Sequence, residues 1–170
     1  MSVVRFNPPA LFATLNTERV RRGLSWITIE REIGVSSGTM KRLQTHEVFE
    51  LDGILFLTQW VGREIEDFTG ELAIEAGEGM GPRRRFDPPE LFGAIDEARK
   101  QRGLTWDDLA DEVAQLPSTL ARLRIYKRFT VHEVLPITQW LGRRTLEFTR
   151  VGPPPEALRR AGPQAEVYGD

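Results

Sequence analysis

The sequence predicts an all-α protein built from two tandem copies of one small helical domain. Residues 5–69 align with residues 85–149 at a constant offset of 80 residues without a gap, and 24 of the 65 aligned positions are identical. Apolar residues recur at helical spacing in both copies, and no stretch has a convincing strand pattern. Proline, glycine and capping residues stand at corresponding places, so we expect five short helices in each copy.

The repeat divides the chain into four segments. We expect a first domain at 1–69, a linker at 70–84, a second domain at 85–149 and a loosely ordered tail at 150–170. Because one copy is small for independent stability, mutual packing of the two copies is expected. The identical pairs Arg5-Phe6 and Arg85-Phe86 precede the first helices and are interpreted as docking arms.

Composition limits the functional classes. The 23 Lys and Arg residues against 25 Asp and Glu residues give a net charge of −2, so a nucleic-acid site would need local clustering of basic residues. The chain has no cysteine, which excludes disulfides, thiolate metal sites and cysteine nucleophiles. Without an apolar run as long as a membrane span or a signal peptide, we expect a cytoplasmic protein with no membrane partner.

The first two helices of each copy follow from their boundary residues. Pro8-Pro9 begins a helix that Gly23 ends, because proline is tolerated in the first turn and glycine suits the left-handed C′ position. Ser25 is expected to cap a second helix at 26–33, and Thr105 stands at the corresponding place in the second copy. The tryptophans that begin both second helices are expected to pack against the first helix.

A tight turn leads into the third helix. Gly34 permits a left-handed exit from the second helix, and Ser36 is a good cap for a third helix at 37–43. In the second copy Pro117 stands at the first position of the corresponding helix, 117–123, where proline is permitted. These two segments are the centre of each copy.

A fourth helix is expected at 51–61 and at 131–141. Pro136 lies inside the second of these and predicts a kink or a late helix start. Trp60 and Trp140 close apolar runs and are interpreted as core or inter-repeat contacts. A fifth short turn is expected to return four apolar side chains to the core: Ile65, Phe68, Leu146 and Phe148.

The order of these elements resembles the Cro/C1-type (XRE-family) helix-turn-helix domain of bacterial and phage repressors. The residues that carry the resemblance are Arg22-Gly23-Leu24-Ser25, Gly34-Val35-Ser36 and Thr39-Met40-Lys41-Arg42-Leu43. The resemblance implies a lambda-repressor-like fold over residues 9–69 and 89–149, with the third helix as the DNA recognition helix. The second copy departs from the pattern because Ala114 replaces the turn glycine.

The resemblance also implies which side chains meet DNA. Residues at the exposed start and middle of the third helices would face base edges: Ser37, Gly38, Lys41, Arg42, Pro117, Ser118, Ala121 and Arg122. The hydroxyl groups of Ser36, Thr39 and Thr119 are candidate donors to phosphates. Residues 114–128 contain no acid, so Arg124, Lys127 and Arg128 complete a local basic patch. The alternative interpretation is that these are ordinary caps and solvated surface charges.

The sequence therefore predicts a sequence-specific double-stranded DNA-binding transcriptional regulator, expected to act as a repressor. One chain would act as a covalent pseudo-dimer with recognition helices 37–43 and 117–123. Because Lys41 corresponds to Ala121 and Gly38 to Ser118, we expect an asymmetric or imperfectly palindromic operator.

The alternative function is a protein-interaction scaffold that has this fold and has lost DNA binding. Four acidic residues in the second helix of the second copy favour it: Asp107, Asp108, Asp111 and Glu112. No catalytic constellation, cofactor motif or metal site is recognisable, so we expect no enzyme activity. The sequence leaves open whether the chain forms a further homodimer or binds a protein partner.

Overall fold

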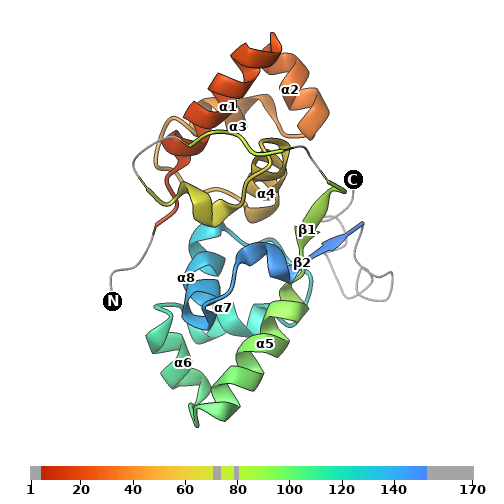
Figure 1. Ribbon diagram of the computed structural model, residues 1–170. Helices are drawn as coiled ribbons and strands as arrows, with labels where there is room; N and C mark the ends of the chain where they lie inside the picture. Colours follow the sequence, from red (N-terminus) through yellow and green to blue (C-terminus); the bar gives the residue numbers. More distant parts are fainter. Residues whose placement is uncertain (1–4, 71–73, 79–80, 153–170) are drawn as a thin grey trace.

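The computed structural model describes residues 5–70, 74–78 and 81–152. Within these ranges the chain forms eight α-helices, two 3-10 helices and one two-stranded antiparallel sheet. Of the predicted all-α class, the mainly helical content is confirmed, and the expectation of no strands is wrong. Figure 1 shows the first half of the chain (residues 5–70) above the second half (residues 84–152). Most of the predicted tail, from residue 153 on, lies outside the described residues.

Corresponding elements of the two halves begin 80 residues apart. The first half contains α1 (Pro8–Arg22), α2 (Trp26–Ile33), α3 (Ser37–Arg42), α4 (Leu51–Trp60) and the 3-10 helix η1 (Ile65–Phe68). The second half contains α5 (Pro88–Gln101), α6 (Trp106–Glu112), α7 (Pro117–Arg122), α8 (Val131–Leu141) and the 3-10 helix η2 (Thr145–Phe148). The third and fourth helices begin at the predicted residues.

The sheet joins the segment before α5 to the end of the second half. Strand β1 (Arg84–Phe86) pairs with β2 (Thr149–Val151), with Arg85 opposite Arg150. Residue 84 of the predicted linker and residues 150 and 151 of the predicted tail therefore belong to an ordered sheet. A strand of three residues is too short to show the alternation from which a sequence reveals strands.

The helix boundaries show why these segments fold locally. Gly23 and Gly34 have φ angles of 66° and 80° and end α1 and α2, as predicted. The Ser25 hydroxyl accepts the N–H of Thr28 at 3.1 Å, which satisfies one donor of the first turn of α2. Ala114 replaces a glycine at the start of the second turn and still takes a positive φ of 54°.

Pro136 is accommodated in the middle of α8, which begins at Val131, so of the two expected alternatives, a kink or a late helix start, the late start is excluded. Proline has no N–H, and the carbonyl of His132, four residues earlier, therefore lacks its helical donor. The side-chain amide of Gln115 supplies one, with 3.1 Å between Nε2 and the His132 oxygen. A residue of the α6–α7 turn thus repairs the hydrogen-bond ladder of α8.

A shared core runs through both halves. Its fully buried side chains include Leu11, Ile29, Leu43, Ile54, Leu91, Leu109, Leu123 and Val134. Trp26 stacks on Phe12 with 5.3 Å between ring centroids, and Trp106 stacks on Phe92 at 5.2 Å, so both tryptophans pack against the first helix as expected.

The fifth turn of the second half differs from its prediction at one residue. Leu146 is half-buried, and Thr145 takes the buried place beside Phe148. A 3-10 helix has three residues per turn, so residues 145 and 148 share a side and residue 146 does not. Trp60 is buried as expected, whereas Trp140 is only partly buried.

Equivalent residues of the two halves pair with each other just before α4 and α8. The Leu51 N–H donates to the Phe129 carbonyl at 2.8 Å, and the Val131 N–H donates to the Phe49 carbonyl at 3.0 Å. The result is an antiparallel bridge between Glu50 and Thr130, which are themselves 80 residues apart. Equivalent groups that exchange the same bonds are the mark of a two-fold relation, so a local two-fold axis passes through this bridge.

The segment before α5 docks on the first half. The Phe86 N–H donates to Asp52 Oδ1 at 2.8 Å, and the Arg84 N–H donates to Gln59 Oε1 at 2.8 Å. In the first half the corresponding Phe6 is buried and lines a cavity together with Leu135 of α8. The docking arm expected at residues 85–86 is therefore confirmed, and its target is the opposite half of the chain.

Candidate nucleic-acid interface

The structure places most predicted DNA-contacting side chains at the surface of α3, α7 and the loops that follow. Ser36, Gly38, Lys41, Arg42, Pro117, Ser118, Ala121, Arg124 and Arg128 are exposed, and Thr39, Arg122 and Lys127 are half-buried. Ser37 begins α3. Thr119 is only 7% exposed, because it faces the interior of the second half, and its hydroxyl offers little surface to a phosphate.

Arg42 braces the end of α3 against the loop that forms the two-fold bridge. Its Nε donates to Glu47 Oε2 at 2.7 Å, and its Nη2 donates to the Val48 carbonyl at 3.0 Å. Its guanidinium also lies over the ring of Phe49, with 4.9 Å from Cζ to the centroid. These contacts fix the side chain on the protein surface.

Arg122 makes the corresponding set of contacts at the end of α7. Its Nη2 donates to the Arg128 carbonyl at 2.8 Å, and its guanidinium lies 4.7 Å from the centroid of Phe129. Its carboxylate partner is Glu133, at 2.8 Å from Nη1. The two arginines therefore position the third helices relative to the junction. These bonds use part of the five N–H donors of each guanidinium, so fewer of them are available for base contact.

Ser36 stands at the N-cap position of α3 without the predicted capping hydrogen bond. Its Oγ lies 2.9 Å from Thr39 Oγ1, so the two hydroxyls bond to each other and no cap bond reaches a backbone N–H of the helix. In the second half Leu116 takes this position and is 68% exposed. The bonded hydroxyl pair of Ser36 and Thr39 therefore has no counterpart in the second half.

Two long stretches of sequence that include the third helices contain no acidic residue. Residues 34–46 and 114–132 contain no Asp or Glu and carry six basic residues: Lys41, Arg42, Arg122, Arg124, Lys127 and Arg128. Part of this charge is neutralised by acids from flanking segments, as in the Arg128 Nη1 pair with Glu50 Oε2 at 3.6 Å. A local excess of positive charge remains on a chain whose net charge is negative.

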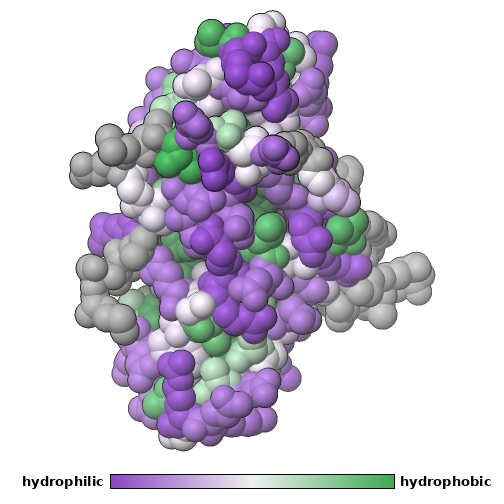
Figure 2. All heavy atoms as spheres, viewed as in Figure 1, coloured by the Kyte–Doolittle hydropathy of each residue, from purple (hydrophilic) through white to green (hydrophobic). Residues whose placement is uncertain are grey.

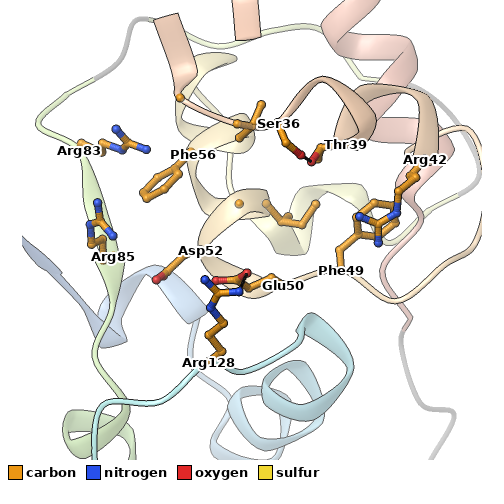
Figure 3. Close-up of a pocket in the computed structure, with 14 residues that line it drawn as sticks. Ser36, Thr39, Arg42, Phe49, Glu50, Asp52, Phe56, Arg83, Arg85 and Arg128 are labelled. Atoms are coloured by element: carbon orange, nitrogen blue, oxygen red, sulfur yellow. Dashed lines mark hydrogen bonds and ion pairs between the residues drawn. The ribbon is translucent and has the colours of Figure 1, made fainter. Parts of the chain in front are cut away.

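The structure adds two arginines that the sequence interpretation missed. Arg83 and Arg85 precede α5, yet they line a cavity together with the α2–α3 turn of the first half and with Arg128 of the second (Figure 3). A Cβ built on Gly34 would come within 3.1 Å of Arg83 Nη2. Residues 83–85 are the longest run of basic residues in the sequence, and that run was the available signal.

Asp52 lies between this cavity and the docked arm: it lines the cavity, and its Oδ1 accepts the Phe86 N–H. Burial raises its pKa to about 6, although the hydrogen bond from the Phe86 N–H favours the anion. The charge of Glu50 raises the pKa further, and the charges of Arg85 and Arg83 lower it. The corresponding residue of the second half is His132, which is exposed.

Two of the acidic residues of α6 are engaged in contacts within the chain. Asp108 is engaged in the capping box with Thr105, and Glu112 Oε2 accepts the indole N–H of Trp140 at 2.6 Å. Among the described residues there is no cluster of three or more His, Asp or Glu side chains arranged to hold a metal ion. None of the helices described is both long and apolar enough to cross a membrane.

Comparison with known proteins adds no relative: no protein-family model, no curated protein and no solved structure matches the chain. The function is therefore inferred from the geometry of the chain itself.

Proposed function

We propose that the chain is a sequence-specific double-stranded DNA-binding regulator, in which two tandem lambda-repressor-like helix-turn-helix domains form one covalent pseudo-dimer. The observation that carries this proposal is the exchange of backbone hydrogen bonds around Glu50 and Thr130. We infer that this local two-fold relates the two halves as a whole. A two-fold rotation preserves direction along its axis, so it would place α3 and α7 on the same side. Helix-turn-helix dimers use this arrangement to place two recognition helices in major-groove turns about 34 Å apart.

The charge distribution supports binding on this side. The acid-free stretches at 34–46 and 114–132 follow the α2–α3 and α6–α7 turns, and the exposed Lys41 and Arg124 lie on or next to the third helices. Phosphate contacts made by such side chains supply most of the sequence-independent affinity for DNA. The remaining acids lie mainly on other helices and on the 3-10 turns.

The contacts across the two-fold axis explain why one chain would replace a homodimer. Glu64 and Arg144 are equivalent positions, and they form an ion pair with 2.9 Å between Oε2 and Nε. Arg144 Nη2 also lies 2.9 Å from Asp67 Oδ1. Two identical copies would place like charges together here. We therefore propose that a single chain, without cofactor, metal or enzyme activity, recognises an asymmetric operator and represses by occupying it.

The test is selection of binding sites from a random duplex library, followed by titration of the selected duplex at several salt concentrations. The proposal expects one chain per duplex, an asymmetric consensus and an affinity that falls steeply with salt, because bound cationic side chains release counterions. A perfect palindrome bound by two chains would refute the pseudo-dimer. Absence of binding to any duplex at low salt would refute DNA binding itself.

The scaffold alternative is favoured by one observation. Arg42 and Arg122, the strongest candidates for base contact, are bonded within the chain.

The surface argues against the scaffold alternative. Figure 2 shows a mainly hydrophilic face on which hydrophobic residues form scattered patches, so this face offers no continuous apolar surface to a protein partner. The low-salt titration decides between the two functions.

A further inference from the structure

A cavity of about 320 Å³ lies at the junction of the two halves, beside the α2–α3 turn (Figure 3). Four segments contribute to its wall: the start of α3, the start of α4, the arm before α5 and the loop before α8. The side chains that matter are Ser36, Thr39, Asp52, Arg83, Arg85 and Arg128. The arm before α5 and the loop before α8 thus complete a wall whose other lining residues belong to the first half.

Positive charge dominates this wall. Four arginines and two carboxylates line the cavity: Arg42, Arg83, Arg85 and Arg128, with Glu50 and Asp52. Glu50 is paired with Arg128, and Asp52 accepts the Phe86 N–H at 2.8 Å. Both acids are thus engaged with the protein, and Arg42 is itself paired with Glu47, which lies outside the cavity wall. The four arginines still outnumber the three carboxylates Glu47, Glu50 and Asp52, so the electrostatic potential in the cavity favours an anion.

The polar groups are arranged for a phosphate. The guanidinium groups of Arg83 and Arg85 lie over the ring of Phe56, with 3.7 Å and 5.3 Å from Cζ to the centroid. Stacking fixes the plane of a guanidinium through its face, whereas oxyanions are bound through its N–H edge. Figure 3 shows the Ser36 and Thr39 hydroxyls on another wall of the same cavity. Arginine forks and hydroxyl donors are the groups that proteins use to bind phosphate oxygens.

The corresponding place in the second half has a different character. Its cavity, of about 410 Å³, is lined by Phe6, Leu135 and Pro136, with Arg5 as its one arginine. Leu116 corresponds to Ser36, which removes one of the two hydroxyls. The arginine-rich cavity is therefore a property of particular residues of the first turn and is not a general consequence of the fold.

We propose that the first cavity binds a small molecule that carries a phosphate or diphosphate group, and that this ligand competes with duplex DNA. The volume of the cavity lies at the lower end of the range for small-molecule sites, which fits a compact anion. The competition rests on the proposed function, because Ser36, Thr39 and Arg42 both line the cavity and belong to the proposed DNA surface.

The experiment measures pyrophosphate binding to the full chain by calorimetry at constant ionic strength. Three variants are compared with the wild type: the double variant Arg83→Gln with Arg85→Gln, the single variant Arg128→Gln, and a control that combines Arg21→Gln with Lys100→Gln. The control removes two positive charges from side chains that are 67% exposed on α1 and α5. Thermal unfolding confirms that each variant is folded.

The wild type and the control are expected to bind pyrophosphate equally. The double variant should bind roughly tenfold or more weakly, because it loses two charge-assisted contacts. Arg128→Gln should weaken binding by a smaller factor, since its guanidinium is already paired with Glu50. Absence of pyrophosphate binding to the wild type, or equal binding by all variants, would overturn the inference.

Duplex affinity of the same proteins separates this inference from the proposed function. If the wild type binds duplex but not pyrophosphate, the cavity has no phosphate ligand and DNA binding stands. If it binds pyrophosphate but no duplex, the cavity site stands and DNA binding fails. If saturating pyrophosphate leaves duplex affinity unchanged at constant ionic strength, the competition is refuted.

Discussion

The α2–α3 and α6–α7 turns occupy equivalent places in the two halves, and their chemistry has diverged. The first turn has a glycine at its start and a hydroxyl pair beside it, and it faces an arginine-lined cavity. The second has Ala114, Gln115 and Leu116, and the side-chain amide of Gln115 donates to the carbonyl in α8 that lacks its helical donor. One turn is thus equipped for an anion, and the other is committed to holding its own half together. A homodimer could not divide these tasks, because its two turns would be identical.

The largest expected effect concerns the aromatic residues on the two sides of the bridge. Phe129 is 2% exposed and meets Phe86 edge to face at 5.7 Å. Phe129→Ala is expected to lower the free energy of unfolding by about 3–5 kcal/mol, through lost burial and the cavity that remains. The equivalent Phe49→Ala should cost about 1 kcal/mol less, since Phe49 has no such ring partner among the described residues. Urea denaturation measures both, and equal losses would show that the two sides are energetically alike.

The second comparison is between Asp52 and His132, which are equivalent. The folded-state pKa of Asp52, about 6, lies above its ordinary value of 3.8. Its contribution to stability is therefore complete below about pH 4 and is lost as the pH rises through about 6. Asp52→Asn keeps an acceptor for Phe86 and removes the charge, so it should abolish this pH dependence and stabilise the protein at pH 7 by up to about 3 kcal/mol.

His132→Asn is the matched control, because His132 is exposed and should tolerate the change with little effect. Unfolding free energies between pH 4 and pH 7 provide the readout. A wild-type profile that Asp52→Asn leaves unaltered would show that Asp52 is not the group responsible.

The three lysines of the chain provide a matched test of the DNA-binding surface. Lys41 lies on α3 and Lys127 in the loop after α7, whereas Lys100 lies at the end of α5. Lys41→Ala and Lys127→Ala are each expected to weaken duplex binding by about 1 kcal/mol and to lower the salt slope by about 1. Lys100→Ala should alter neither quantity. Equal effects of all three would indicate a diffuse electrostatic attraction with no defined site.

The smallest expected effect tests the repair of α8. Gln115→Ala removes the donor to the His132 carbonyl and should cost about 1 kcal/mol of unfolding free energy. Pro136→Ala restores an N–H to the helix, so Gln115→Ala should cost less in that background. A double-mutant cycle measures this coupling, and additive losses would contradict it.

Much of the helical structure follows from local signals. Pro8 and Pro88 begin α1 and α5, Ser25 caps α2, and Gly34 ends it with a positive φ, all as the sequence predicts. Each of these signals acts over about four residues, so a pattern in the chain reveals it directly. The same reasoning failed for Ser36, whose hydroxyl bonds to the Thr39 hydroxyl and makes no bond to a backbone N–H of α3.

The candidate site was predicted less completely, since its residues act over long sequence distances. The positions of α3 and α7 were predicted, but the anchoring of Arg42 by Glu47 and Phe49 was not, because a rotamer depends on packing. Arg83 and Arg85 reach the first turn because Phe86 donates to Asp52, 34 residues earlier, and Arg84 donates to Gln59, 25 residues earlier. No periodicity in the sequence encodes such a contact.

The sequence by itself determined the helical class, the order of the elements and the equivalence of the two halves in register. These depend on capping, backbone preference and the spacing of apolar residues, all of which are local. Only the tertiary structure decided that Leu51 pairs with Phe129 and Val131 with Phe49, that the arm before α5 crosses to the opposite half, and that an arginine-lined cavity forms where they meet. Those outcomes depend on which buried surfaces fit together once the helices exist, and that fit is a property of the whole folded chain.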